Sequence, residues 1–146
     1  MKKMILAASL LVPGAGAEAA LFINNNTDCT VYVQVYAHDL NHGTCGLISG
    51  RVTVLPNSSA AFNNVTNLNT TPGWLGQTAV TTGGTTVWGW DGAAFNGSLG
   101  GLIGNTTACF STDVLTVPDN GCVPSASVTA TWTSINSTTA IVEFTP

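Results

Sequence analysis

Charged side chains are scarce in this chain. Only 7% of its 146 residues are charged, with three Lys or Arg against seven Asp or Glu. Two of the three basic residues, Lys2 and Lys3, lie at the N-terminus, so Arg51 is the one basic residue after residue 20. Binding a nucleic acid requires a cluster of Lys and Arg that neutralises phosphates. The sequence therefore excludes nucleic-acid binding and argues against electrostatic attachment to an anionic membrane.

Apolar runs are also scarce, and the longest lies at the N-terminus. Residues 4–12 form a run that is apolar apart from Ser9, follow Lys2 and Lys3, and lead to the small-x-small triplet Ala17-Glu18-Ala19. This pattern is typical of a secretory signal peptide, and the run is shorter than the roughly 20 residues that span a bilayer. We expect a signal peptide over residues 1–19 and a single domain over residues 20–146, with no transmembrane segment. The alternative is a short N-terminal membrane anchor.

Helical periodicity is missing after residue 20. Short runs of β-branched and aromatic residues alternate instead with clusters of Asn, Gly, Pro and Asp. The pattern predicts an all-β domain, an antiparallel two-sheet β-sandwich of about eight to ten strands without a helix. Gly83-Gly84 predicts a hairpin, and the Gly-rich residues 91–104 predict a long loop. Strands are expected at residues 21–23, 29–37, 48–55, 59–62, 74–82, 85–90, 107–110, 114–117, 127–135 and 139–144.

The four cysteines all follow the expected signal peptide. They are Cys29, Cys45, Cys109 and Cys122. An even number of cysteines in an exported chain indicates disulfides, and four cysteines allow three pairings. We expect the local pairing, Cys29 with Cys45 and Cys109 with Cys122, because each bond would tie a turn-rich segment to a strand end. Each such loop would contribute about 3 kcal/mol in the chain-entropy model.

A row of possible metal ligands follows the second expected strand. It consists of His38, Asp39, His42 and Cys45. The two histidines are four residues apart, a spacing that converges on a metal only in a helix, and this segment is expected to be a loop. We therefore expect solvent-exposed histidines, with a weak zinc or copper site as the alternative. No metal site and no cofactor is predicted.

Catalytic patterns are missing too. The chain has no Gly-x-Ser-x-Gly motif, and a catalytic triad would have to use His38 or His42 from one short segment. Glycoside hydrolysis needs two carboxylates on either side of a cleft. Asp91 and Glu143 are such a pair in principle, but nothing in the sequence selects them. The sequence predicts no catalytic residue and a protein that is not an enzyme.

Tryptophans give the strongest hint of a binding site. Trp88 and Trp90 are two residues apart, which places them on one face of a strand, and Asp91 follows directly. Exposed coplanar aromatics stack on sugar rings, and a carboxylate at their edge binds hydroxyls. The three residues therefore form a candidate carbohydrate-binding site. The alternative is that the pair belongs to the core, where Trp132 is also expected.

Several segments resemble small secreted bacterial β-sandwich proteins of unassigned function. The resemblance covers about half of the chain. It implies a fold and an exported location, and it implies no catalytic or binding residue. The segments that carry it are Phe22-Ile23-Asn24-Asn25-Asn26-Thr27, Cys29-Thr30-Val31-Tyr32-Val33, Val52-Thr53-Val54-Leu55-Pro56-Asn57-Ser58-Ser59, Trp90-Asp91-Gly92-Ala93 and Ala130-Thr131-Trp132-Thr133.

These features predict a secreted, non-enzymatic domain that acts in adhesion or extracellular assembly. Its location would be extracellular or at the cell surface, and a periplasmic location stays open. The alternative function is a carbohydrate-binding module that uses the aromatic pair. The expected partner is a second copy of the chain or an extracellular glycan. Self-association would pair an exposed edge strand, for which residues 21–23 are the candidate.

Overall fold

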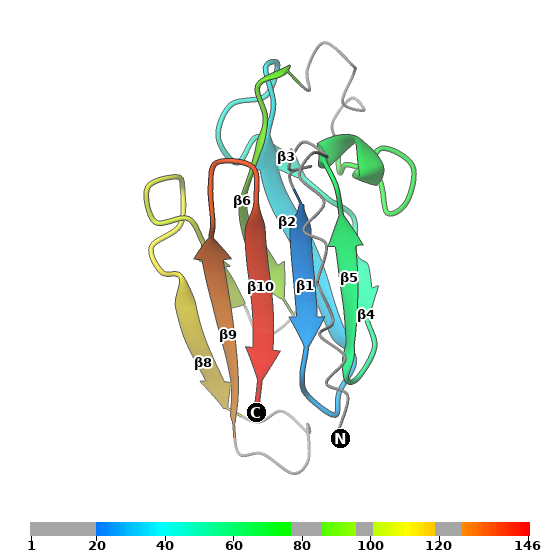
Figure 1. Ribbon diagram of the computed structural model, residues 1–146, viewed down its shortest axis with the longest axis vertical. Coiled ribbons are helices and arrows are strands. Elements are labelled where there is room, and N and C mark those ends of the chain that lie inside the picture. The colour runs from blue at the N-terminus through cyan, green and yellow to red at the C-terminus, as the bar shows by residue number, and fades with distance from the viewer. Residues whose placement is uncertain (1–19, 77–85, 96–100, 119–126) are drawn as a thin grey trace, which may run out of the picture.

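The computed structural model describes residues 20–76, 86–95, 101–118 and 127–146 (Figure 1). In this part of the chain ten β-strands form two sheets of five strands each, and one short 3₁₀ helix, η1 (Val65–Leu68), lies beside them. The all-β prediction is confirmed. The predicted signal peptide and the hairpin at Gly83-Gly84 lie outside the described residues. No helix among the described residues is long and apolar enough to cross a membrane.

The first sheet brings the two ends of the domain together. β1 and β10 are parallel, and every other pair in this sheet is antiparallel. The prediction of a purely antiparallel fold is therefore wrong for this pair, which joins the first and last strands and so needs no tight hairpin. In spatial order the strands are β5 (Ser58–Phe62), β1 (Leu21–Asn25), β10 (Ala140–Thr145), β9 (Ser127–Ser134) and β8 (Val114–Pro118).

The position of β1 also corrects the expected edge strand. β1 pairs on one side with β10 and on the other with β5. Its backbone hydrogen-bonding groups therefore face strands of the same chain on both sides. Residues 21–23 are interior to the sheet and present no free edge to a second copy.

The second sheet is built around β2. Its spatial order is β3 (Leu47–Ile48), β2 (Val31–His38), β6 (Gly89–Phe95) and β7 (Gly101–Gly104), and β4 (Val52–Val54) also pairs with β2. β3 and β4 together replace the single strand predicted at residues 48–55. The strand is interrupted between them from Ser49, whose hydroxyl accepts a hydrogen bond from the Val35 N–H at 2.8 Å.

β6 and β7 lie where a long loop was predicted. The glycines of this segment suggested a loop, but Gly92, Gly101 and Gly104 are strand residues against which aromatic rings pack. A Cβ at Gly101 would overlap the Phe95 ring, and a Cβ at Gly92 or Gly104 would overlap the Phe110 ring. Glycine inside a strand often marks such a close approach. Residues 107–110 were predicted as a strand, but 107–109 are turn residues and Phe110 belongs to no strand.

Buried side chains from both sheets belong to one hydrophobic cluster. The alternation along β2 is regular, with Val31, Val33 and Val35 buried. Phe95 of the second sheet meets Phe144 of the first, with ring centroids 5.2 Å apart. Trp132 on β9 is buried in this cluster, as its alternation with threonines predicted.

The disulfide pairing differs from the predicted one. Cys45 is bonded to Cys109, with 6.4 Å between their Cα atoms. Cys29 is disulfide-bonded as well, and Cys122 lies outside the described residues. The bond between Cys45 and Cys109 ties the segment after β2 to the segment after β7. The prediction that each cysteine pairs with its neighbour in the sequence was wrong. The segments of Cys45 and Cys109, 64 residues apart, are brought together by the pairing of β2 with β6 and of β6 with β7.

Candidate binding site on the outer face of the second sheet

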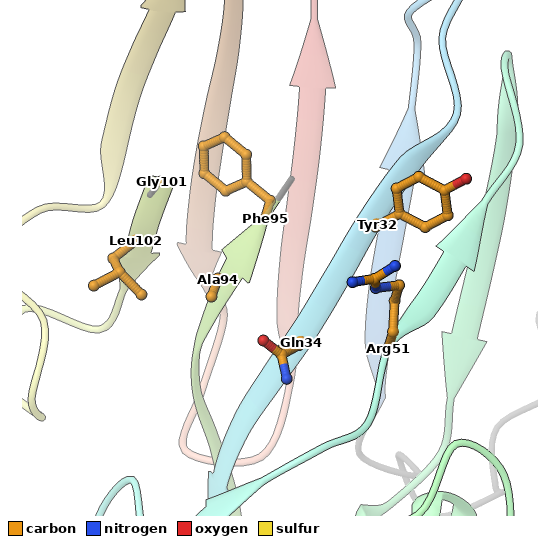
Figure 2. A pocket seen from close by; sticks show the side chains of 7 residues that line it. All are labelled: Tyr32, Gln34, Arg51, Ala94, Phe95, Gly101 and Leu102. Atoms are coloured by element: carbon orange, nitrogen blue, oxygen red, sulfur yellow. The ribbon is translucent and has the colours of Figure 1, made fainter. Parts of the chain in front are cut away.

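A row of side chains crosses the face of the second sheet that points away from the core. Gln34 on β2 lies opposite Ala94 on β6, and Ala94 lies opposite Leu102 on β7. Val33 and Val35 point to the core, so Gln34 between them points outward. Figure 2 shows Ala94 and Gln34 between Leu102 on one side and Tyr32 with Arg51 on the other.

The small side chain in the middle of this row creates a groove. Ala94 is flanked by two longer side chains, and Phe95 and Gly101 also line the groove. The cavity has a volume of about 190 Å³. At the rim, Leu102 is 48% exposed and Tyr32 is 41% exposed. The groove is therefore apolar at its floor and open to solvent.

Arg51 forms one wall of the groove together with Tyr32. The guanidinium carbon of Arg51 lies 5.2 Å from the centroid of the Tyr32 ring, a cation–π arrangement. Among the described residues no carboxylate forms an ion pair with Arg51, and the ion pairs found there join His38 to Asp91 and His42 to Asp39. The guanidinium thus lies against an aromatic ring, and no carboxylate of the described residues forms an ion pair with it.

Gln34 supplies an amide to the same groove. Its Nε2 donates a hydrogen bond to the carbonyl oxygen of Ser49 at 3.3 Å. This bond orients the side chain and leaves the amide oxygen as a possible acceptor for a ligand hydroxyl. The groove therefore combines one cation, one amide and an apolar floor.

A second depression of about 230 Å³ lies next to the first, and Leu102 lines both. Phe110 covers Gly92 and Gly104 here, and its ring meets the edge of the Tyr36 ring at a centroid distance of 5.3 Å. Cys109, which is bonded to Cys45, precedes Phe110 directly. The disulfide therefore holds this aromatic side chain on the sheet.

The sequence predicted solvent-exposed loop histidines, but each histidine contacts a buried aspartate. The Nδ1 of His38 lies 2.8 Å from Oδ1 of Asp91, and the Nδ1 of His42 lies 2.7 Å from Oδ1 of Asp39. Both carboxylates are almost fully buried. Each histidine is therefore oriented by an aspartate, and Asp91 also accepts a hydrogen bond from the Cys45 N–H at 2.7 Å. No group of three or more potential metal ligands converges within the described ranges.

The predicted site at Trp88, Trp90 and Asp91 is not an exposed platform. Trp90 is 3% exposed and Asp91 is 2% exposed. Trp88 precedes β6 and packs partly buried against the core, with its ring perpendicular to that of Trp90 at an interplanar angle of 85°. The exposed, coplanar rings that a sugar platform needs are not present, and the alternative that the pair belongs to the core holds for Trp90, which faces inward opposite Ala37.

Sequence reasoning overlooked the outer face of β2. The signal was present, since Tyr32, Gln34 and Tyr36 alternate with buried valines. What the sequence did not show was which strands lie beside them. Leu102 and Phe110 belong to segments predicted as a loop and a strand, so their place on this face follows only from the sheet order.

Comparison of the chain with family models, with curated proteins and with solved structures finds no match. The site is therefore interpreted from its own geometry.

Proposed function

We propose that this protein is an exported, non-enzymatic β-sandwich domain that acts in adhesion, and that it binds its partner through the groove around Ala94. An extracellular or cell-surface location suits the proposal, because the N-terminal sequence has the pattern of a signal peptide and the domain contains a disulfide. The face-to-face packing of the two sheets is part of the proposal and accords with their shared hydrophobic cluster.

One observation supports this role above the others. The sole basic residue after residue 20, Arg51, stands at the rim of an open apolar groove and is oriented there by Tyr32. Ligand sites generally combine apolar lining with a few placed polar groups. This groove has that composition, and its lining residues lie on or beside β2, β6 and β7. The groove thus offers what a binding surface needs.

Extracellular assembly through a second copy of the chain is less well supported. The candidate edge strand for self-pairing is interior to the first sheet. A glycan remains the better partner, with the groove in place of the Trp88–Trp90 pair as its platform.

The test compares two exposed leucines. The purified mature domain and its Leu102→Asn variant are assayed for retention on a panel of immobilised polysaccharides and on whole cells. Leu55→Asn serves as the control, because Leu55 is 61% exposed and does not line the groove. We expect Leu102→Asn to reduce retention at least several-fold and Leu55→Asn to leave it unchanged. Equal retention of all three proteins on every surface would refute the groove as the contact site.

A further inference from the structure

We infer that the groove takes an acidic saccharide, a sugar ring whose carboxylate pairs with Arg51. The inference rests on the proposed function, since it names the ligand class of the same groove. It goes further in assigning separate roles to the charged wall and to the apolar floor.

The size of the groove supports a single sugar ring. Its volume of about 190 Å³ exceeds the roughly 150 Å³ of an apolar cavity that holds one benzene ring. A pyranose has an apolar C–H face and a rim of hydroxyls. The methyl group of Ala94 and the side chain of Leu102 suit the C–H face, and the oxygen of Gln34 suits a hydroxyl.

Charge complementarity selects the acid over a neutral sugar. Arg51 carries the only positive charge of a Lys or Arg side chain in residues 20–146, which contain six acidic residues. A planar guanidinium binds a carboxylate through two parallel N–H···O bonds. Because the guanidinium already lies against the Tyr32 ring, part of the side-chain freedom of Arg51 is lost before a ligand carboxylate binds.

The net charge of the chain limits the length of such a ligand. A long polyanion would be repelled by the acidic surplus of the domain, whereas one carboxylate at Arg51 is matched. We therefore expect a short acidic oligosaccharide to be the bound unit.

The experiment uses one ligand in two charge states. Galacturonic acid disaccharide and its methyl ester have the same rings, and the ester lacks the charge. Affinities for the mature domain are measured by calorimetry and by NMR shift perturbation. We expect the acid to bind about tenfold or more tightly than the ester, the difference of one charge-assisted contact.

Variants separate the roles of the two walls. We expect Arg51→Gln to lower the affinity for the acid to that for the ester and to leave the ester unchanged, while Arg51→Lys keeps part of the preference. Gln34→Ala should lower the affinity for the acid and for the ester to a similar extent. The NMR spectrum of each free variant verifies that the domain is folded.

Several outcomes would overturn the inference. Equal affinity for the acid and the ester would refute the ion pair with Arg51. The same conclusion would follow if Arg51→Gln lowered the affinity for both ligands equally. Equal or tighter binding of a peptide with a free terminal carboxylate would make the ligand a peptide. If neutral polysaccharides bind and the binding depends on Leu102, the adhesion proposal survives while the acidic saccharide fails. If neither ligand binds and Leu102→Asn changes no retention, both proposals fail.

Discussion

His38 and Asp91 are 53 residues apart in the sequence, yet the His38 Nδ1 lies 2.8 Å from the Asp91 Oδ1. Asp91 occupies the irregularity in the pairing of β2 with β6, where Tyr36 pairs with Gly92 and Ala37 with Trp90. The extra residue on β6 is Asp91, as in a β-bulge. Its carboxylate therefore joins β2, β6 and the Cys45 turn.

This contact predicts that Asp91 contributes to stability. Asp91→Ala would leave His38 Nδ1 and the Cys45 N–H without their partner. Because the site is buried, we expect a loss of about 2 kcal/mol in the free energy of unfolding, measured by urea denaturation. Asp113→Ala is the control, since Asp113 is exposed, and it should change stability by less than about 0.5 kcal/mol. Equal effects of the two substitutions would contradict the role of Asp91.

The alternation of buried and exposed residues along the strands made much of the fold predictable from the sequence. β2, β9 and β10 were predicted from runs of β-branched and aromatic residues, and all three are present within a few residues of the predicted bounds. The pattern works because each strand has one buried face, which fixes which side chains are apolar. It carries no information on which strands become neighbours, and the parallel pair β1–β10 was missed for that reason.

The candidate site was hidden by its glycines. Gly92 and Gly104 suggested a loop, although the space they leave is filled by Phe110. The ring that fills this space belongs to another segment, held near by a disulfide between residues 64 apart. Such long-range contacts depend on the sheet order and leave no local pattern. The contact of His38 with Asp91 was missed because it depends on the sheet order. The contact of His42 with Asp39 was missed because the burial of a loop residue has no periodic signal.

Two glycines give a matched test of the Phe110 contact. A Cβ at Gly104 would overlap the Phe110 ring and approach the backbone oxygen of Asp91, whereas a Cβ at Gly43 would have nothing within 4 Å. We expect Gly104→Ala to cost about 1–3 kcal/mol of unfolding free energy through overpacking. Gly43→Ala should leave stability unchanged or slightly raised. Denaturant titration measures both, and a harmless Gly104→Ala would show that Phe110 does not pack there.

The disulfide connectivity has a direct chemical test. Peptide mapping without reduction should yield a fragment that joins Cys45 to Cys109. Recovery of a peptide joining Cys29 to Cys45 would instead support the local pairing.

The same bond should contribute strongly to stability. It closes a loop of 64 residues, and the chain-entropy model gives about 4 kcal/mol for such a loop. We expect the Cys45→Ser, Cys109→Ser double variant to lose up to this amount in the free energy of unfolding. A thermal scan of oxidised and double-variant protein measures the difference, and coincident transitions would contradict it.

Trp90 is expected to behave as a core residue and not as a ligand platform. It is 3% exposed and faces Ala37 across the β2–β6 pair. Replacing a buried aromatic side chain with Ala removes its burial and leaves a cavity, so Trp90→Ala should cost about 3–5 kcal/mol. Trp88→Ala should cost less, because Trp88 is only partly buried. Urea denaturation of the two single variants measures this order. A contradictory result would be a Trp90→Ala variant that keeps its stability but no longer binds polysaccharides. Such a result would support the Trp88–Trp90 pair as a carbohydrate-binding site, because only an exposed ring can be removed with loss of binding and no loss of packing.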